Sequence, residues 1–165
     1  MCFVCNYVSP LGNIIMTSDG TYLTRLVFDD GQHLSPLEKH HASDLPVFNE
    51  TSRWLDIYFS GKNPGFIPDI NPDTTCFRKA VYDVLLNIPF GETSSYADVA
   101  GEVYGDGNIP KLAPRAIGGA VAHNPVLLII PCHRIIGSNG NPGGYAAGTD
   151  RKIKLLKLEN PSFSF

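Results

Sequence analysis

Apolar and polar residues alternate in three short stretches near the start of the chain. The stretches run from Phe3 to Val8, from Asn13 to Met16 and from Tyr22 to Phe28. Turn-forming sequences at residues 9–12 and 18–20 separate them. Alternation with a period of two places the apolar side chains on one face of a strand. The pattern therefore predicts three strands joined by two turns.

The spacing of apolar residues becomes helical after an irregular stretch. Residues 29–46 are rich in acids, histidines and prolines, which predicts a surface connection. Over residues 47–60 the apolar positions recur at roughly helical spacing, and Gly61 follows as a stop signal. Residues 61–75 hold three prolines and two glycines, which is typical of a linker. A domain boundary is expected in this linker.

Three helices are predicted after the linker. The first, capped by Thr74 or Thr75, carries its apolar residues on one face, at Phe77, Val81, Val84 and Leu85. The second is expected to start at Ser94 or Ser95 and to end near Tyr104. The third is expected over residues 114–122, where Pro114 suits the first turn. These two helices suggest a helix-turn-helix, although their connection is longer than the usual three or four residues.

The remaining segments complete a mixed fold. Residues 126–130 form an uninterrupted apolar run that predicts a buried strand or an extended segment, and Asn139-Gly140 predicts a tight turn. A last helix is expected from a cap at Thr149 or Asp150 to Glu159, with Ile153, Leu155 and Leu156 facing inward. We therefore predict an α+β fold. An N-terminal domain of sheet and helix covers residues 1–74, and a mostly helical domain with the helix-turn-helix covers residues 75–165.

Charge is distributed unevenly over this chain of 165 residues, whose net charge is −3. Residues 1–74 carry four basic and nine acidic side chains, whereas residues 75–165 carry nine and seven. Coating nucleic acid through charge alone needs a strongly basic surface. Any anionic partner is therefore expected to bind the second half of the chain.

The four cysteines are expected to be reduced thiols. No apolar stretch reaches membrane-spanning length, and the first residues lack the pattern of an export signal. Thiols of an unexported protein normally stay reduced, so we expect a cytoplasmic protein, or a nuclear one in a eukaryote. Cys2 and Cys5 form a C-x-x-C motif that could bind zinc with His33, His40 or His41. One cysteine pair alone is weak support, so neither a metal nor a cofactor is expected.

Cys132 is the strongest candidate for chemistry. It follows an apolar run and Pro131, and it precedes His133 and Arg134. An imidazole and a guanidinium beside a thiol can stabilise a thiolate that stays accessible, whereas the alternative is a structural, buried cysteine. Glu159 ends a predicted helix, where the helix dipole disfavours a carboxylate. We therefore expect Glu159 to pair with another group.

Ordered sequence blocks between residues 77 and 160 support this choice. They are IPFGETSSY at 88–96, RAIGGA at 115–120, Asn124-Pro125, IPCHRII at 130–136, and the pair of segments 144–145 and 155–159. Together they resemble the O6-alkylguanine-DNA alkyltransferases, also called methylated-DNA–protein-cysteine methyltransferases, with the fourth block similar to the signature around the acceptor cysteine. The N-terminal half is similar only in its Ser-Pro-Leu-Gly turn and general pattern.

The resemblance implies a role for four residues in the reaction. Cys132 would be the alkyl acceptor, and His133 would relay its proton through a water toward Glu159. Asn124 would brace the turns of the site. Without the resemblance, Asn124 would be a turn residue and Glu159 an exposed acid at a helix end.

The resemblance also implies how alkylated DNA would bind. Tyr96 would donate a hydrogen bond to a purine flipped out of the duplex, and Arg115 would enter the gap left behind. Tyr145 would wall the pocket, and Arg134 and Ala146 belong to the same set of substrate-binding positions. The alternatives are core aromatic residues at 96 and 145, and a helix packed through small residues around Arg115.

The implied function is direct-reversal DNA repair. A methyl or small alkyl group would move irreversibly from O6-alkylguanine, and less certainly from O4-alkylthymine, in double-stranded DNA to Cys132. The protein would act as a monomer without contact with a membrane. Two alternatives are a DNA-binding sensor of alkylation and a Cys-His hydrolase, and only a hydrolase would turn over repeatedly. Ala147 stands where the family usually has glycine, which implies a tighter pocket opening.

Overall fold

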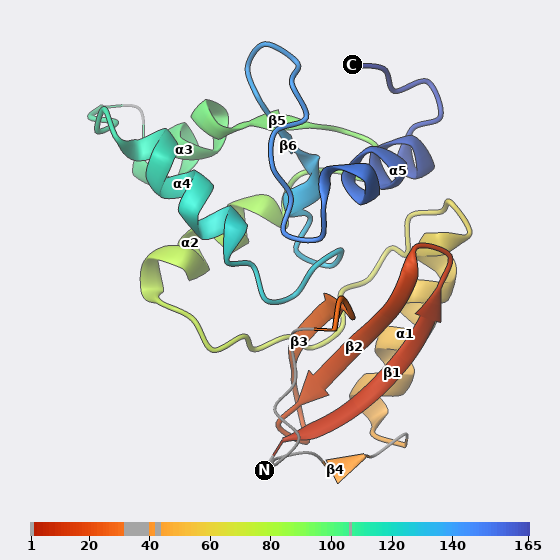
Figure 1. The fold of residues 1–165 in the computed structure, drawn as a ribbon. Coiled ribbons are helices and arrows are strands. Elements are labelled where there is room, and N and C mark those ends of the chain that lie inside the picture. The colour runs from red at the N-terminus through yellow and green to blue at the C-terminus, as the bar shows by residue number, and fades with distance from the viewer. Residues whose placement is uncertain (1, 32–39, 42–43, 106) are drawn as a thin grey trace. The chain divides into compact units, whose positions relative to one another are not determined.

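The computed structural model describes residues 2–31, 40–41, 44–105 and 107–165, with residues 40–41 described by their backbone alone. The chain divides into two compact units. The N-terminal unit comprises residues 1–73 and 125–127, and the C-terminal unit comprises residues 74–124 and 128–165. Figure 1 shows the elements of each unit. No helix among the described residues is long and apolar enough to cross a membrane.

A four-stranded sheet forms the base of the N-terminal unit, in the order β3-β2-β1-β4 (Figure 1). Its strands are β1 (Phe3–Ser9), β2 (Gly12–Ser18), β3 (Leu23–Phe28) and β4 (His40–His41). The first three form the antiparallel meander expected from the alternating pattern, which confirms that prediction. The two-residue strand β4 pairs parallel to β1 within the segment expected to be a surface connection. His33, one of the zinc candidates, lies outside the described residues.

Helix α1 (Pro46–Phe59) contacts β1 and β2, and it confirms the helix predicted over residues 47–60. Leu55 and Tyr58 of this helix are fully buried, as is Met16 of β2. The following linker is held to the unit at two points. The indole N–H of Trp54 donates to the carbonyl of Phe66 at 2.9 Å, and the backbone of Leu23 pairs with that of residues 69–71.

The described part of the C-terminal unit holds three helices and two short parallel strands ahead of its last helix. They are α2 (Cys76–Leu85), β5 (Ser94–Ser95), α3 (Tyr96–Tyr104), α4 (Ala113–Ala122) and β6 (Ile135–Ile136). Each of the three helices contacts the other two. The predicted caps of α2 and α3 are confirmed. Thr75 accepts from the backbone N–H of Arg78, and Ser95 forms a capping box with Asp98.

The apolar run at residues 126–130 is not a strand, which corrects the sequence prediction. Val126 makes one isolated parallel bridge to Leu26, and successive turns follow it. Leu128 has a φ of 71°, in the left-handed region, which no strand can contain. The run is apolar because it is buried in turns. A short 3-10 helix, η1 (Cys132–Arg134), comes next, so the thiol does not lie at the end of a strand.

Helix α5 (Thr149–Glu159) ends where predicted, but its N-cap is Gly148, with no side-chain cap. Thr149 and Asp150 therefore do not cap it. Leu155 and Leu156 face inward as expected, whereas Ile153 is half-buried. The other buried residues of the helix are two charged ones, Lys152 and Glu159.

Candidate active site

The Cys132 thiol is enclosed in the C-terminal unit and held by Asn124. The cysteine is 1% exposed. The amide Nδ2 of Asn124, which follows α4, donates to Sγ of Cys132 at 3.1 Å and to the carbonyl of Ile130 at 2.9 Å. One buried amide therefore contacts both the thiol and the turn before it.

Burial raises the pKa of the Cys132 thiol to about 11, although the Asn124 hydrogen bond and the positive charge of Lys152 act in the opposite direction. The thiol is therefore protonated at neutral pH. This corrects the expectation of an accessible, stabilised thiolate. A proton must leave the thiol before it can act as a nucleophile.

A buried cluster of charged residues lies next to the thiol. Nε2 of His133 lies 2.6 Å from Oε1 of Glu159, and Nε of Arg134 donates to Oε2 at 2.8 Å. The backbone N–H of Gly91 donates to Oε2 at 3.0 Å. The expectation that the helix-terminal Glu159 pairs with other groups is confirmed. The remaining donors of Arg134 go to Oε1 of Glu159 and to the carbonyl of Ile88, so its guanidinium is engaged inside the protein.

These contacts set the protonation states of the cluster. Burial by itself would raise the pKa of the Glu159 carboxyl, but hydrogen bonds and charge from His133 and Arg134 outweigh it and hold that pKa below its usual range. Burial lowers the pKa of His133 despite the opposing effect of Glu159. Glu159 is therefore ionised and His133 neutral. Since Nε2 of His133 donates to the carboxylate, Nδ1 is the basic nitrogen of the ring.

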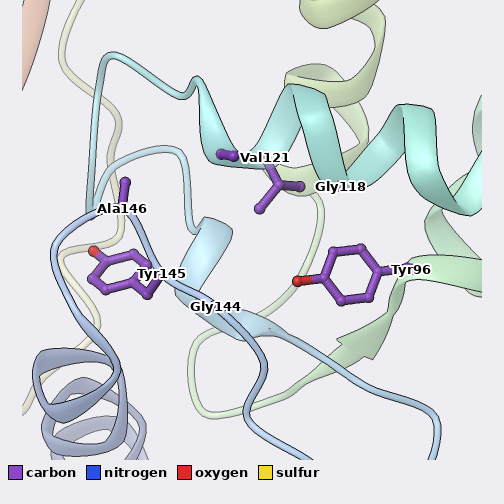
Figure 2. A pocket seen from close by; sticks show the side chains of 7 residues that line it. Tyr96, Gly118, Val121, Gly144, Tyr145 and Ala146 are labelled. Atoms are coloured by element: carbon purple, nitrogen blue, oxygen red, sulfur yellow. The ribbon is translucent and has the colours of Figure 1, made fainter.

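A cavity of about 240 Å³ opens beside the cluster (Figure 2). It is lined by Tyr96, Gly118, Val121, Ala122, Gly144, Tyr145 and Ala146. Three of the predicted binding residues, Tyr96, Tyr145 and Ala146, therefore meet at one pocket. In Figure 2 the rings of Tyr96 and Tyr145 lie on opposite sides, and the Tyr96 hydroxyl points toward Tyr145.

Two glycines lie next to the Tyr96 side chain. A Cβ on Gly118 of α4 would lie 3.9 Å from the ring, and one on Gly143 would lie 3.4 Å from the hydroxyl oxygen. Burial and the neighbouring Cys132 both raise the pKa of the Tyr96 hydroxyl. It therefore stays protonated and can donate a hydrogen bond into the pocket.

Tyr145 forms the opposite wall. Its ring meets that of His133 edge-on, with the centroids 6.3 Å apart. Its hydroxyl oxygen is buried and has no hydrogen-bond partner within the described part of the chain. Burial raises the pKa of this hydroxyl well above its ordinary value, so it too remains protonated.

Arg115 lies apart from these groups. It is exposed on the first turn of α4 and is not among the residues that line the pocket. The same helix contributes Gly118, Val121 and Ala122 to the pocket wall. Helix α4 therefore presents a cation to solvent at one end and borders the cavity further along.

Lys152 is absent from the residues predicted from the sequence, yet it is fully buried in the site. Its Nζ donates to the carbonyls of Ile135 and Gly144. A signal was present in the spacing, because residues 152, 155, 156 and 159 share one face of a helix. Among the described residues, no group of three or more His, Cys, Asp or Glu side chains could hold a metal ion.

The fold and the site define a cysteine-dependent protein, in which one buried thiol beside a histidine–glutamate pair is the reactive group. Residues 76–161 match the family model described as "6-O-methylguanine DNA methyltransferase, DNA binding domain". Residues 6–66 match the model described as "6-O-methylguanine DNA methyltransferase, ribonuclease-like domain".

Individual relatives agree with the family models. A methylated-DNA–protein-cysteine methyltransferase of Methanosarcina acetivorans is 40% identical over 153 residues, which are 93% of this chain and 95% of that relative. The crystal structure of an O6-methylguanine methyltransferase of Mycobacterium tuberculosis has a TM-score of 0.83 at 34% identity, covering 99% of this chain and 96% of that one. A further Mycobacterium tuberculosis structure, in complex with DNA, has the same score and identity and covers 96% and 93%. The chain belongs to the methylated-DNA–protein-cysteine methyltransferase family, which confirms the resemblance.

Proposed function

We propose that the protein repairs DNA directly, by moving a methyl or small alkyl group from O6 of guanine to Sγ of Cys132. The observation that supports this most is the buried Cys132 thiol, which accepts a hydrogen bond from Asn124 and directly precedes the paired His133 and Glu159 side chains. Family membership supports the same chemistry. O4-alkylthymine is a second possible donor.

The proposed step forms a bond between Sγ and the alkyl carbon as the bond between that carbon and O6 breaks. The electron pair of the broken bond stays with the purine. The thiol proton passes to Nδ1 of His133, directly or through an intervening water, while Nε2 stays bonded to Glu159. The purine takes up one proton, so the products are guanine and S-alkylcysteine. Each molecule acts once, because a thioether is not readily hydrolysed.

The alkylated base must leave the duplex, since O6 cannot reach an enclosed thiol from within the base stack. We assign the cavity of Figure 2 to this base. Tyr96 donates a hydrogen bond to it, while Tyr145 and Ala146 enclose it. Arg115, exposed on α4, fills the space that the base leaves. Arg134 supports the site through its contacts with Glu159.

The same proposal assigns parts of the chain to tasks. Residues 75–165 form the domain that binds DNA and accepts the alkyl group, with α3 and α4 as its helix-turn-helix, and residues 1–74 form the N-terminal domain. The protein acts as a monomer on double-stranded DNA. We propose that the protein acts in the cytoplasm, or in the nucleus of a eukaryote. DNA is available there, and the four free cysteines stay reduced.

Intact-mass spectrometry after incubation with duplex DNA containing O6-methylguanine tests the proposal. We expect the mass of one methyl group, mapped to Cys132, and no further gain with excess substrate. Cys132→Ala should gain no methyl group and still bind DNA. The matched control is Cys76→Ser, which removes an exposed thiol at the start of α2 and should react like the wild type. A methyl group on another cysteine, or repeated turnover as in a hydrolase, would overturn the proposal.

A further inference from the structure

The pocket loop, residues 143–148, forms the wall of the cavity opposite Tyr96 (Figure 2). Three consecutive residues of the loop line the cavity, namely Gly144, Tyr145 and Ala146. A glycine in the left-handed region stands at each end of the loop, with a φ of 68° at Gly143 and of 93° at Gly148. Glycine can adopt several backbone conformations at such positions. A change at either end would move the cavity wall relative to Tyr96.

The first turn of α5 contacts backbone carbonyls at both ends of the pocket loop. Nη1 of Arg151 donates to the carbonyl of Ala147 at 3.1 Å. The hydroxyl of Thr149 makes a longer contact, 3.5 Å, with the carbonyl of Gly143. Because Arg151 and Thr149 belong to one helical turn, these contacts join both ends of the loop to a single rigid element.

The Arg151 contact is the stronger of the two. A guanidinium is charged at every accessible pH, and a charged donor makes stronger hydrogen bonds than a neutral one. Arg151 is half-buried, so water competes only partly for its donors. Its acceptor belongs to Ala147, which is buried and directly follows the pocket-lining Ala146. A donor that fixes the carbonyl of Ala147 therefore limits movement of the adjoining cavity wall.

We propose that Arg151 is a positioning residue that determines which alkyl groups the site accepts, because it holds the pocket loop to α5. The inference rests on the proposed function, in which the cavity receives an O6-alkylated guanine. A methyl group adds little volume to the base, whereas a benzyl group adds a whole ring. The larger adduct needs the loop to yield, so the hydrogen bond from Arg151 disfavours it selectively.

Three substitutions test this role. Arg151→Met removes the donor and keeps a long side chain. Arg151→Lys keeps a charged donor and should restore part of the wild-type behaviour. Lys154→Met makes a similar change at an exposed position of α5 and is the matched control. Each protein reacts with O6-methylguanine and O6-benzylguanine, both as free bases and within oligonucleotides of one sequence, and single-turnover rates are compared.

We expect Arg151→Met to raise the ratio of the benzyl rate to the methyl rate about threefold or more, since one hydrogen bond that restrains the loop is lost. The ratio should rise with free bases and with oligonucleotides alike. The methyl rate itself should not rise, because a looser loop positions the base less firmly. Lys154→Met should match the wild type.

Hydrogen exchange supplies a measurement that needs no substrate. The backbone N–H of Gly148 donates to the carbonyl of Tyr145 at 3.0 Å, within the pocket loop. Exchange of this N–H should become faster in Arg151→Met and stay unchanged in Lys154→Met. If the wild type transfers no alkyl group, the proposed function is wrong, whereas exchange at Gly148 still shows whether Arg151 holds the loop.

Three outcomes overturn the proposal. The first is an unchanged ratio of rates in Arg151→Met, and the second is a loss by one common factor for all substrates, as general damage to the fold would give. The third is an equal loss for both adducts that is confined to oligonucleotides, which would make Arg151 a contact to DNA. If Arg151→Met does not fold, Thr149→Val decides, because it removes the other donor to the loop and should raise the same ratio.

Discussion

Cys132 combines enclosure with reactivity. Cys2 and Cys76 are exposed, yet neither has a histidine–glutamate pair beside it in the described structure. Burial favours the protonated Cys132 thiol, which is less reactive than a thiolate toward unrelated electrophiles. The site therefore favours a reaction partner that enters the pocket next to it.

Ala146 lines the pocket and Ala147 does not. The sequence implied that Ala147 narrows it, but Ala147 is 7% exposed and does not line the cavity, whereas Ala146 does. We expect Ala146→Leu to slow reaction with O6-benzylguanine at least tenfold more than reaction with O6-methylguanine, because overfilling a packed site costs about 1–3 kcal/mol. Single-turnover rates on oligonucleotides carrying each adduct measure this.

Ala147→Gly provides the comparison. It should leave the ratio of the two rates unchanged and lower stability by about 1 kcal/mol, since it removes a buried methyl group and adds backbone freedom. A selective gain for the benzyl adduct in Ala147→Gly would show that position 147 controls size after all.

Individual site residues differ in how visible they are in the sequence. Cys132 was singled out by its neighbours in the sequence and Glu159 by its place at a helix end, whereas the roles of His133, Tyr96 and Tyr145 come from blocks that resemble the family. Lys152 was missed because lysine is almost always a surface residue, although its spacing from Leu155, Leu156 and Glu159 places it on the buried face of the helix. The protonated resting state of the thiol was also beyond the sequence, since it depends on enclosure by segments distant in the chain.

Helix α5 is held to the site by its last residue. The carboxylate of Glu159 receives hydrogen bonds from Arg134 and Gly91 and bonds to His133. We expect Glu159→Gln to lower the free energy of unfolding by about 3–5 kcal/mol, because it leaves the buried Arg134 guanidinium without its counter-charge. Chemical denaturation measures the loss, and Glu102→Gln, at an exposed position of α3, should stay near the wild type.

The same carboxylate predicts a dependence on pH. The folded-state pKa of Glu159 is lower than its ordinary value of 4.5, so the unfolded chain binds more protons between the two values. Its stabilising contribution is complete above that ordinary value and is lost as the pH falls toward the folded-state value. Stability of Glu159→Gln should therefore fall less steeply than that of the wild type below pH 4.5. If the stabilities of the two proteins fall equally steeply below pH 4.5, Glu159 does not have the lowered pKa that the prediction assumes.

A substitution on helix α4 can distinguish base extrusion from the alkyl-transfer step. Arg115 is exposed and lies outside the pocket lining. We expect Arg115→Ala to slow repair of O6-methylguanine in duplex DNA at least tenfold, because an extruded base leaves an unfilled gap. Reaction with free O6-benzylguanine should barely change. Equal losses on both substrates would indicate a role in folding or chemistry, and Lys154→Ala, exposed on α5, is the control.

The elements that sequence patterns predict well are those with local signals. The caps at Thr75 and Ser95 and the alternation in β1, β2 and β3 are local, and each was confirmed. The strand predicted at residues 126–130 was wrong, because a short apolar segment has the same sequence pattern whether it is buried in a sheet or in turns. The conformation of Leu128 depends on tertiary packing that no local pattern records.

The two units of the chain differ in net charge, and this difference affects how strongly DNA binding should depend on salt. Residues 1–74 carry four basic and nine acidic side chains, whereas residues 75–165 carry nine basic and seven acidic ones, a small positive excess. A domain with so small a positive excess can make few contacts between basic side chains and DNA phosphates. The affinity of this protein for DNA should therefore depend less on salt concentration than the affinity of a strongly basic protein does. Recognition then rests more on the fit of the extruded base than on charge.

Alkylation should destabilise the molecule that carries it out. A methyl group on Sγ of Cys132 must fit where the residue is 1% exposed, and it weakens the hydrogen bond from Asn124. We expect a loss of about 1–3 kcal/mol, which for a chain of this size lowers the Tm by a few degrees. Calorimetry before and after stoichiometric reaction with methylated DNA measures the shift. Cys132→Met, whose side chain is one methylene longer than that of S-methylcysteine, should lower the Tm at least as much without substrate. Hydrogen exchange should increase first around residues 128–136, next to the added methyl group. An unchanged Tm in the methylated protein would mean that the site already holds space for the product.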